Sequence, residues 1–134
     1  MPSTTVDRAL AAAQVINARK PVHGETQAQM LVYYAQAWSL VWDGRPLFAN
    51  RIEAWQMGPV VPSLRHALPV IRQAPPAGVF TSTEEATLGA VTDYYGDLES
   101  RLSSTGARRA LRAKQHMLTL LVVSGMFPAT AVGL

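Results

Sequence analysis

Few side chains in this 134-residue chain have the types and spacing that catalysis or metal binding requires. His23, His66 and His116 lie far apart in the sequence and lack the short spacings of zinc ligands. A metal site would therefore need tertiary convergence, and surface or helix-capping histidines are the favoured interpretation. The paired carboxylates Glu84 and Glu85 fall at a predicted helix start, where acidic side chains complement the helix dipole.

Motifs for covalent or phosphoryl chemistry are also missing from the sequence. There is no cysteine, no G-x-S-x-G nucleophile elbow and no glycine-rich phosphate loop. Asp43, Glu53 and Asp97 could act together only if the fold brought them into one cleft. We therefore predict that the protein is not an enzyme and uses no metal or other cofactor.

Positive charge is concentrated near the C-terminal end of the sequence. Residues 1–100 carry 7 Lys and Arg against 9 Asp and Glu, whereas residues 101–134 carry 5 and no acid, so the net charges are −2 and +5. A solvated helix face is the simplest interpretation of this basic run. The alternatives are nucleic-acid contact through phosphate attraction, an acidic protein partner or an anionic lipid surface. The candidate nucleic-acid-binding residues are Arg108, Arg109, Arg112 and Lys114.

A central stretch, residues 30–64, holds all three tryptophans and must position most of the large side chains. Its first part has apolar residues at spacings of 3 and 4, so we predict a helix from about Gln27 to a stop at Gly44. Thr26 and Gln29 fit a capping box at the helix start. The aromatic rings span more than one core face needs, so some of them should reach the surface. The apolar stripe comprises Met30, Tyr33, Tyr34, Ala37, Trp38 and Val41.

The same stretch resembles a known family. The segments MLVYYAQAW and GRPLFANRIEAWQMGPVVP resemble the Panacea domain of SocA-like antitoxins and of phage-associated GepA-type proteins. That family's pattern is roughly L-Q-K-L-L-Y-Y-A-Q-G-W, then G-K-P-L-F-x-x-x-I-E-A-W-x-x-G-P-V-V-P. With looser similarity on either side, the resemblance covers about residues 7–98, and the chain departs from the pattern beyond them. The matching residues are Tyr33–Gln36, Trp38, Gly44, Pro46–Phe48, Ile52–Trp55 and Gly58–Pro62.

The resemblance implies a function. Panacea domains are antitoxin modules that bind and neutralise a toxin encoded beside them, and some SocA-like members deliver the toxin to a protease. This chain would then neutralise a cognate small protein toxin in a bacterium or a phage. Two alternatives come from other classes: a nucleic-acid-binding regulator that uses the basic run, and a phage protein that inhibits a host defence factor.

We predict that the toxin binds around the segment Asp43–Val61, which follows the central helix and where polar and apolar residues alternate beside the aromatic anchor Trp55. Glu53 has apolar neighbours on both sides in the sequence. It is either an internal strut for the Gly58-Pro59 turn or a contact to a basic partner. The predicted partner-binding residues are Trp38, Arg51, Glu53, Trp55, Gln56 and Pro59.

The whole sequence predicts a mainly α fold. Four or five helices should surround a Trp/Tyr core, with at most one short β-pair near residues 47–56. Residues 1–100 would form the Panacea-like domain, and residues 101–134 a divergent C-terminal extension that is irregular at its end. Besides the central helix, helices are expected at Val6–Arg19, Pro62–Arg72 with a break near Ala67, Thr83–Ser100 and Ala107–Val123.

Targeting features are absent from the sequence. The first residues lack the basic and apolar regions of a secretion signal, and no run of about 18 apolar residues occurs. We therefore expect a cytoplasmic protein with no membrane partner. Hydrophobic residues make up 49% of the chain, which is enough for one core. The sequence leaves the oligomeric state open.

Overall fold

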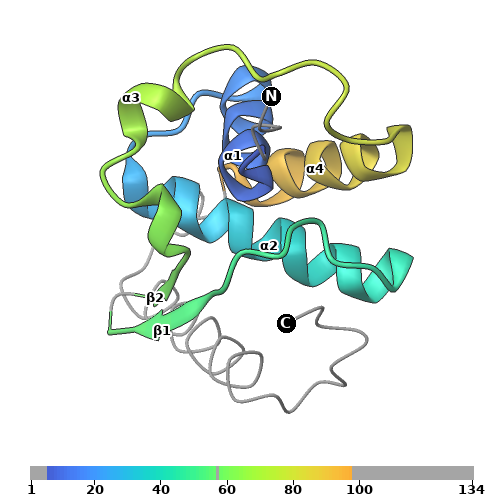
Figure 1. Cartoon of the computed structure of the whole chain (residues 1–134), viewed down its shortest axis with the longest axis horizontal. Coiled ribbons are helices and arrows are strands. Elements are labelled where there is room, and N and C mark those ends of the chain that lie inside the picture. The colour runs from blue at the N-terminus through green and yellow to red at the C-terminus, as the bar shows by residue number, and fades with distance from the viewer. Residues whose placement is uncertain (1–5, 57, 98–134) are drawn as a thin grey trace, which may run out of the picture.

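The computed structural model describes residues 6–56 and 58–97 (Figure 1). This part of the chain is mainly helical and contains one antiparallel pair of short strands, so the predicted fold class is confirmed. The predicted Trp/Tyr core is correct for tyrosine only, because Tyr33 and Tyr34 are buried whereas no tryptophan is fully buried. Successive elements are α1 (Arg8–Arg19), α2 (Glu25–Asp43), β1 (Glu53–Trp55), β2 (Gly58–Val60), the 3-10 turn η1 (Pro62–Leu64), α3 (Leu68–Ile71) and α4 (Ser82–Tyr95).

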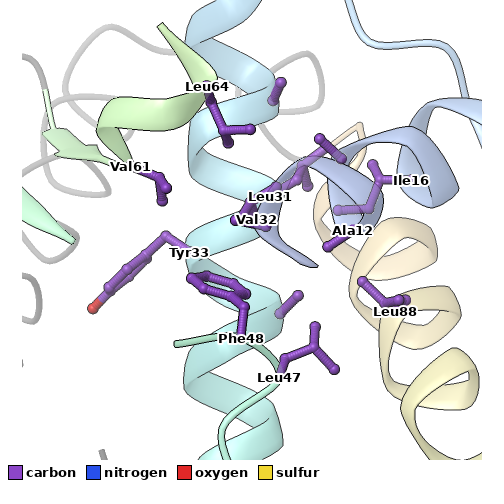
Figure 2. Close-up of a cluster of buried hydrophobic side chains, with 14 of the residues drawn as sticks. Ala12, Ile16, Leu31, Val32, Tyr33, Leu47, Phe48, Val61, Leu64 and Leu88 are labelled. Atoms are coloured by element: carbon purple, nitrogen blue, oxygen red, sulfur yellow. The ribbon is translucent and has the colours of Figure 1, made fainter. Parts of the chain in front are cut away.

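The core lies where α1, α2 and α4 pack on one another, and α3 and η1 cover α1 (Figure 1). The buried face of α1 is rich in alanine, and such small side chains let helices approach closely. Figure 2 shows Ala12 and Ile16 of α1, Leu88 of α4, and Leu47 and Phe48 from the segment after α2 gathered around α2. A segment without regular structure therefore contributes two of the largest core side chains.

The start of α2 differs from the capping-box prediction. The helix begins at Glu25, and Gly24 precedes it without any side-chain capping bond. The prediction that Gln29 caps this helix is wrong, because the Gln29 side chain is buried and its amide binds Val61 instead. The predicted stop is confirmed, since Gly44 has a φ of 65°, which glycine adopts without strain.

The third predicted helix is divided into η1 and α3. The predicted break is confirmed at Ala67, which precedes α3. Pro69 lies in the first turn of α3, where its missing N–H disrupts no helical hydrogen bond. Between the two pieces, His66 has a φ of 59°, and its N–H donates to the Glu25 carboxylate at 2.6 Å.

The last described helix, α4, starts with a capping box at the predicted helix start. The Thr81 side chain accepts from the Glu84 N–H, and the Glu84 carboxylate accepts from the Thr81 N–H. The helix ends at Tyr95. The predicted end at Ser100 and the predicted helix Ala107–Val123 lie outside the described residues.

Residues 44–61, here called the connection, run from α2 through the hairpin of β1 and β2. Two buried glutamines of α2 hold the two ends of this connection. The Gln36 oxygen accepts from the N–H groups of Leu47 at 2.7 Å and Phe48 at 3.2 Å, and its amide nitrogen donates to the Phe48 carbonyl at 2.8 Å. The Gln29 oxygen accepts from the Val61 N–H at 2.8 Å, and its nitrogen donates to the Val61 carbonyl at 3.3 Å.

These five bonds make burial of the connection possible. A buried backbone group without a partner costs about 1–3 kcal/mol, so an irregular segment cannot enter a core unless other groups pair with it. Gln29 and Gln36 are about two helical turns apart and therefore lie on one face of α2. That face of α2 thus holds the connection at its entrance and at its exit.

We expect Gln36→Leu to destabilise the fold strongly. Leucine keeps most of the side-chain volume but leaves two N–H groups and one carbonyl of the connection unpaired in the core. At about 1–3 kcal/mol for each group, the free energy of unfolding in urea should fall by at least about 3 kcal/mol.

Gln73→Leu is the matched control, because Gln73 is exposed and follows α3. Its effect should stay within about 0.5 kcal/mol, as is usual for surface positions. Equal unfolding free energies for the two variants would contradict the role assigned to Gln36.

Candidate partner-binding site

The hairpin of β1 and β2 is the exposed part of the connection. In its antiparallel register, Glu53 pairs with Val60 and Trp55 pairs with Gly58. Gly58 has a φ of 128°, a conformation that side chains rarely allow, so glycine permits the tight reversal there. The inner strand β2 packs against α2, and β1 lies outside it (Figure 1). Trp55 is consequently held near the hairpin tip, with 41% of its surface exposed.

Hydrogen bonds and stacking fix the Trp55 ring. The indole N–H donates to Glu53 Oε1 at 2.8 Å, and Arg51 Nε donates to Glu53 Oε2 at 2.8 Å. On the ring face, the Arg65 guanidinium lies 5.0 Å from the ring centroid, close enough for a cation–π interaction. Glu53 and Arg65 therefore hold the exposed Trp55 ring in one orientation, and Arg51 in turn holds the Glu53 carboxylate.

A further ion pair ties this assembly to α2. Arg65 Nη1 donates to Glu25 Oε2 at 3.2 Å, and Glu25 is the first residue of α2. The hydrogen bond from the His66 N–H to the same carboxylate stabilises the left-handed conformation between η1 and α3. We call the set Glu25, Arg51, Glu53, Trp55 and Arg65 the Trp55 platform.

The contacts with Trp55 and Arg51 change the pKa of the Glu53 carboxyl group. The Trp55 N–H and, next, the Arg51 guanidinium hold the pKa of Glu53 below its usual value, because both donate to the charged carboxylate. Each carboxylate oxygen already has a donor from the same chain. Glu53 thus has a structural role, as one of the two interpretations proposed. It holds the Trp55 indole and Arg51, however, and not the Gly58-Pro59 turn.

Four of the six predicted partner-binding residues come together. Arg51, Glu53 and Trp55 belong to the platform, and Gln56 is exposed beside them. Pro59 does not join this surface, because it lies buried in β2.

Trp38 also lies elsewhere. It is half-buried on the side of α2 that faces α4, where its indole N–H donates to the Tyr95 hydroxyl at 2.9 Å. Arg65 and Glu25 were not among the predicted partner-binding residues. Both lie outside the connection, and only tertiary packing brings them to the Trp55 ring.

A groove of about 970 Å³ lies on another side of the connection, near the start of α4. Arg8 lines it and has three hydrogen-bond partners: the carbonyls of Leu47 and Val79 at 2.8 Å each, and Glu84 Oε2 at 2.7 Å. Its guanidinium also lies 4.7 Å from the centroid of the Phe80 ring. The donors of Arg8 are thus engaged by the protein itself, and this arginine joins three segments of the fold.

Asp43, Glu53 and Asp97, which could act together only in one cleft, contact different parts of the fold. Asp43 accepts from the Thr87 hydroxyl, whereas Asp97 pairs with Lys20. Within residues 6–56 and 58–97, no three His, Asp or Glu side chains form a group that could hold a metal ion. His116 and the basic run from Arg108 to Lys114 lie outside the described residues. None of the helices in the described part is long and apolar enough to cross a membrane.

We expect Trp55→Phe to raise the pKa of Glu53 toward its usual value, because phenylalanine lacks the indole donor. In the wild type, the stabilisation from the lowered pKa is present above the unfolded-state pKa and is lost as pH falls through the folded-state pKa. Side-chain carboxyl NMR titration measures the change directly.

Asp93 is the internal control for that titration. Its pKa is also lowered, in this case by the hydrogen bond from Arg19, and it should not respond to Trp55→Phe. An unchanged Glu53 midpoint in the variant would show that the indole does not bind this carboxylate in solution.

Comparison with known proteins places the chain in a family. The family model described as antitoxin SocA-like, Panacea domain, matches residues 29–104, which is more than half of the sequence. Neither the curated proteins nor the solved structures give a significant match. The matched residues include the connection, the Trp55 hairpin and α4, together with most of α2. The chain therefore belongs to the SocA-like antitoxin family with a Panacea domain, as the sequence resemblance predicted.

Proposed function

We propose that this chain is the antitoxin of a toxin–antitoxin pair, and that it binds and neutralises a cognate small protein toxin without catalysing a reaction. Membership of the SocA-like family supports an antitoxin role in general. The observation that carries our choice of binding surface is the exposed and oriented Trp55 ring of the platform.

The platform has the properties of an interface hot spot. Tryptophan and arginine are enriched among the residues that dominate protein binding energy. A side chain that is already fixed loses less conformational freedom on binding, which favours affinity. Arg51 and Gln56 are exposed next to the ring and can supply polar contacts at its rim.

The charges of the platform are balanced. Its two arginines face two glutamates, and each arginine donates a hydrogen bond to one of these carboxylates. Toxin binding at this surface would therefore depend on the Trp55 ring and on local hydrogen bonds more than on long-range attraction. Because an antitoxin must keep its toxin bound in growing cells, we expect nanomolar affinity, about −12 kcal/mol.

Co-expression with the small protein encoded by the neighbouring gene tests this function. Wild type should restore growth, whereas Glu53→Arg and Trp55→Ala should not, provided that circular dichroism shows both variants folded. Glu53→Arg removes the acceptor of the indole and places a third arginine in the platform. If the opposing toxin surface is basic, the new arginine also repels it, and the combined loss should be several kcal/mol.

Glu85→Arg is the matched control. It makes the same change of charge at an exposed position in α4. Its rescue should equal that of wild type. If the folded Glu53→Arg variant also restores growth fully, the platform is not the toxin site. The amount of toxin in the rescued cells separates two mechanisms: a stable complex indicates direct neutralisation, and depleted toxin indicates delivery to a protease.

The nucleic-acid alternative remains a prediction. It depends on Arg108, Arg109, Arg112 and Lys114, which lie outside the described residues. Among the described residues, most cations form ion pairs with carboxylates of the same chain and are less available to phosphate groups. The paired cations are Arg8, Arg19, Lys20, Arg51 and Arg65.

A further inference from the structure

A second aromatic surface lies where α2 and α4 meet. Three of its large side chains are well exposed: Val41 by 66%, Trp42 by 54% and Tyr94 by 64%. Together with Trp38 and Tyr95 they form what we call the aromatic face. Trp38 reaches Tyr95 of α4 and stacks on Trp42, whereas the Trp55 platform lies on the hairpin, so the proposed toxin site does not account for the aromatic face.

The rings of the aromatic face form a continuous array. Trp38 and Trp42 stack with centroids 4.7 Å apart, and Trp38 donates to the Tyr95 hydroxyl at 2.9 Å. Tyr95 in turn stacks on Tyr34 at 4.0 Å and meets Tyr94 edge to face at 4.8 Å. The array thus extends from the buried ring of Tyr34 to the exposed ring of Tyr94. Contiguous exposed apolar surface of this kind marks an interaction site.

We propose that the C-terminal extension of the same chain docks on the aromatic face through the apolar side of a helix within residues 107–123. The position of the extension supports this assignment. The described chain ends at Asp97, only two residues after Tyr95 of the aromatic face. A linker of ten residues can span about 33 Å, so the predicted helix is within reach of the whole face.

The composition of the extension also fits this surface. On a helix, four of its apolar residues would fall on one side, which gives a stripe to lay along the rings. The extension has a net charge of +5 and no acidic residue, whereas residues 1–100 have a net charge of −2, so long-range attraction favours the contact. The stripe consists of Leu111, Leu118, Leu121 and Val122.

Tryptophan fluorescence of the full chain provides the first test and requires no toxin. In a Trp55→Phe background, the emission comes from Trp38 and Trp42 alone. Adding Leu118→Asp and Leu121→Asp should shift this emission to longer wavelength and increase its quenching by acrylamide, because the covering apolar side chains are lost.

Ala113→Asp with His116→Asp is the control pair. It introduces the same two charges on the other side of the predicted helix and should leave both signals unchanged. If the two pairs of substitutions give the same emission and the same quenching, the extension does not cover Trp38 and Trp42, and the proposal is wrong.

Disulfide trapping gives an independent second measurement, because the natural sequence contains no cysteine. Val41→Cys should form a bond within one molecule to a cysteine at Leu111, Leu118 or Val122 but not to one at Ala113. Bonds that form only between two molecules would show that a second copy occupies the face. That result, or the absence of any bond from the stripe, would overturn docking of the chain's own extension.

Discussion

The structure depends on one constraint: the connection between α2 and η1 enters the core although its first half has no regular secondary structure. Its buried N–H and C=O groups cannot pair with a neighbouring strand there and must find partners elsewhere. Gln36 supplies partners for Leu47 and Phe48, and Gln29 supplies them for Val61. Because both glutamines come from one rigid helix, the two ends of the connection are fixed relative to each other. The hairpin that carries Trp55 is consequently presented in one position.

Other polar contacts extend this arrangement to the rest of the domain. Arg8 of α1 binds the Leu47 carbonyl, so the backbone of Leu47 is held through its N–H by Gln36 and through its carbonyl by Arg8. The same guanidinium reaches Glu84, whose carboxylate also caps α4. The helical core and the exposed hairpin are therefore joined by specific hydrogen bonds as well as by apolar packing. A surface held in this way loses less conformational freedom when a partner binds.

Much of this architecture is predictable from local sequence rules. Apolar spacing predicts the helices, Thr81 with Glu84 predicts the start of α4, and Gly44 predicts the end of α2. The role of Gln29 was not predictable, because the same amide group can form hydrogen bonds either to the start of its own helix or to the backbone of a distant segment. The stacking of Arg65 on Trp55 and the burial of Pro59 likewise depend on tertiary packing.

The separate location of Trp38 could have been inferred from helix geometry. Residues two positions apart in a helix point in directions about 200° apart. Trp38 must therefore face away from Gln36 and from the connection that Gln36 binds. The six predicted binding residues therefore do not form one surface, because Trp38 lies beside α4 and Pro59 is buried in β2. The structure assigns Trp38 to the aromatic face and the hairpin residues to the Trp55 platform.

The most direct test of the account is amide hydrogen exchange on the free chain and on its complex with the protein encoded by the neighbouring gene. Complex formation should slow exchange in the hairpin, residues 53–60, and protect the Trp55 indole N–H. Amides within α1 should exchange at the same rate in both states, because α1 lies in the core away from the platform. A complex that protects other surfaces and leaves the hairpin and the indole unchanged would contradict the Trp55 platform as the toxin-binding site.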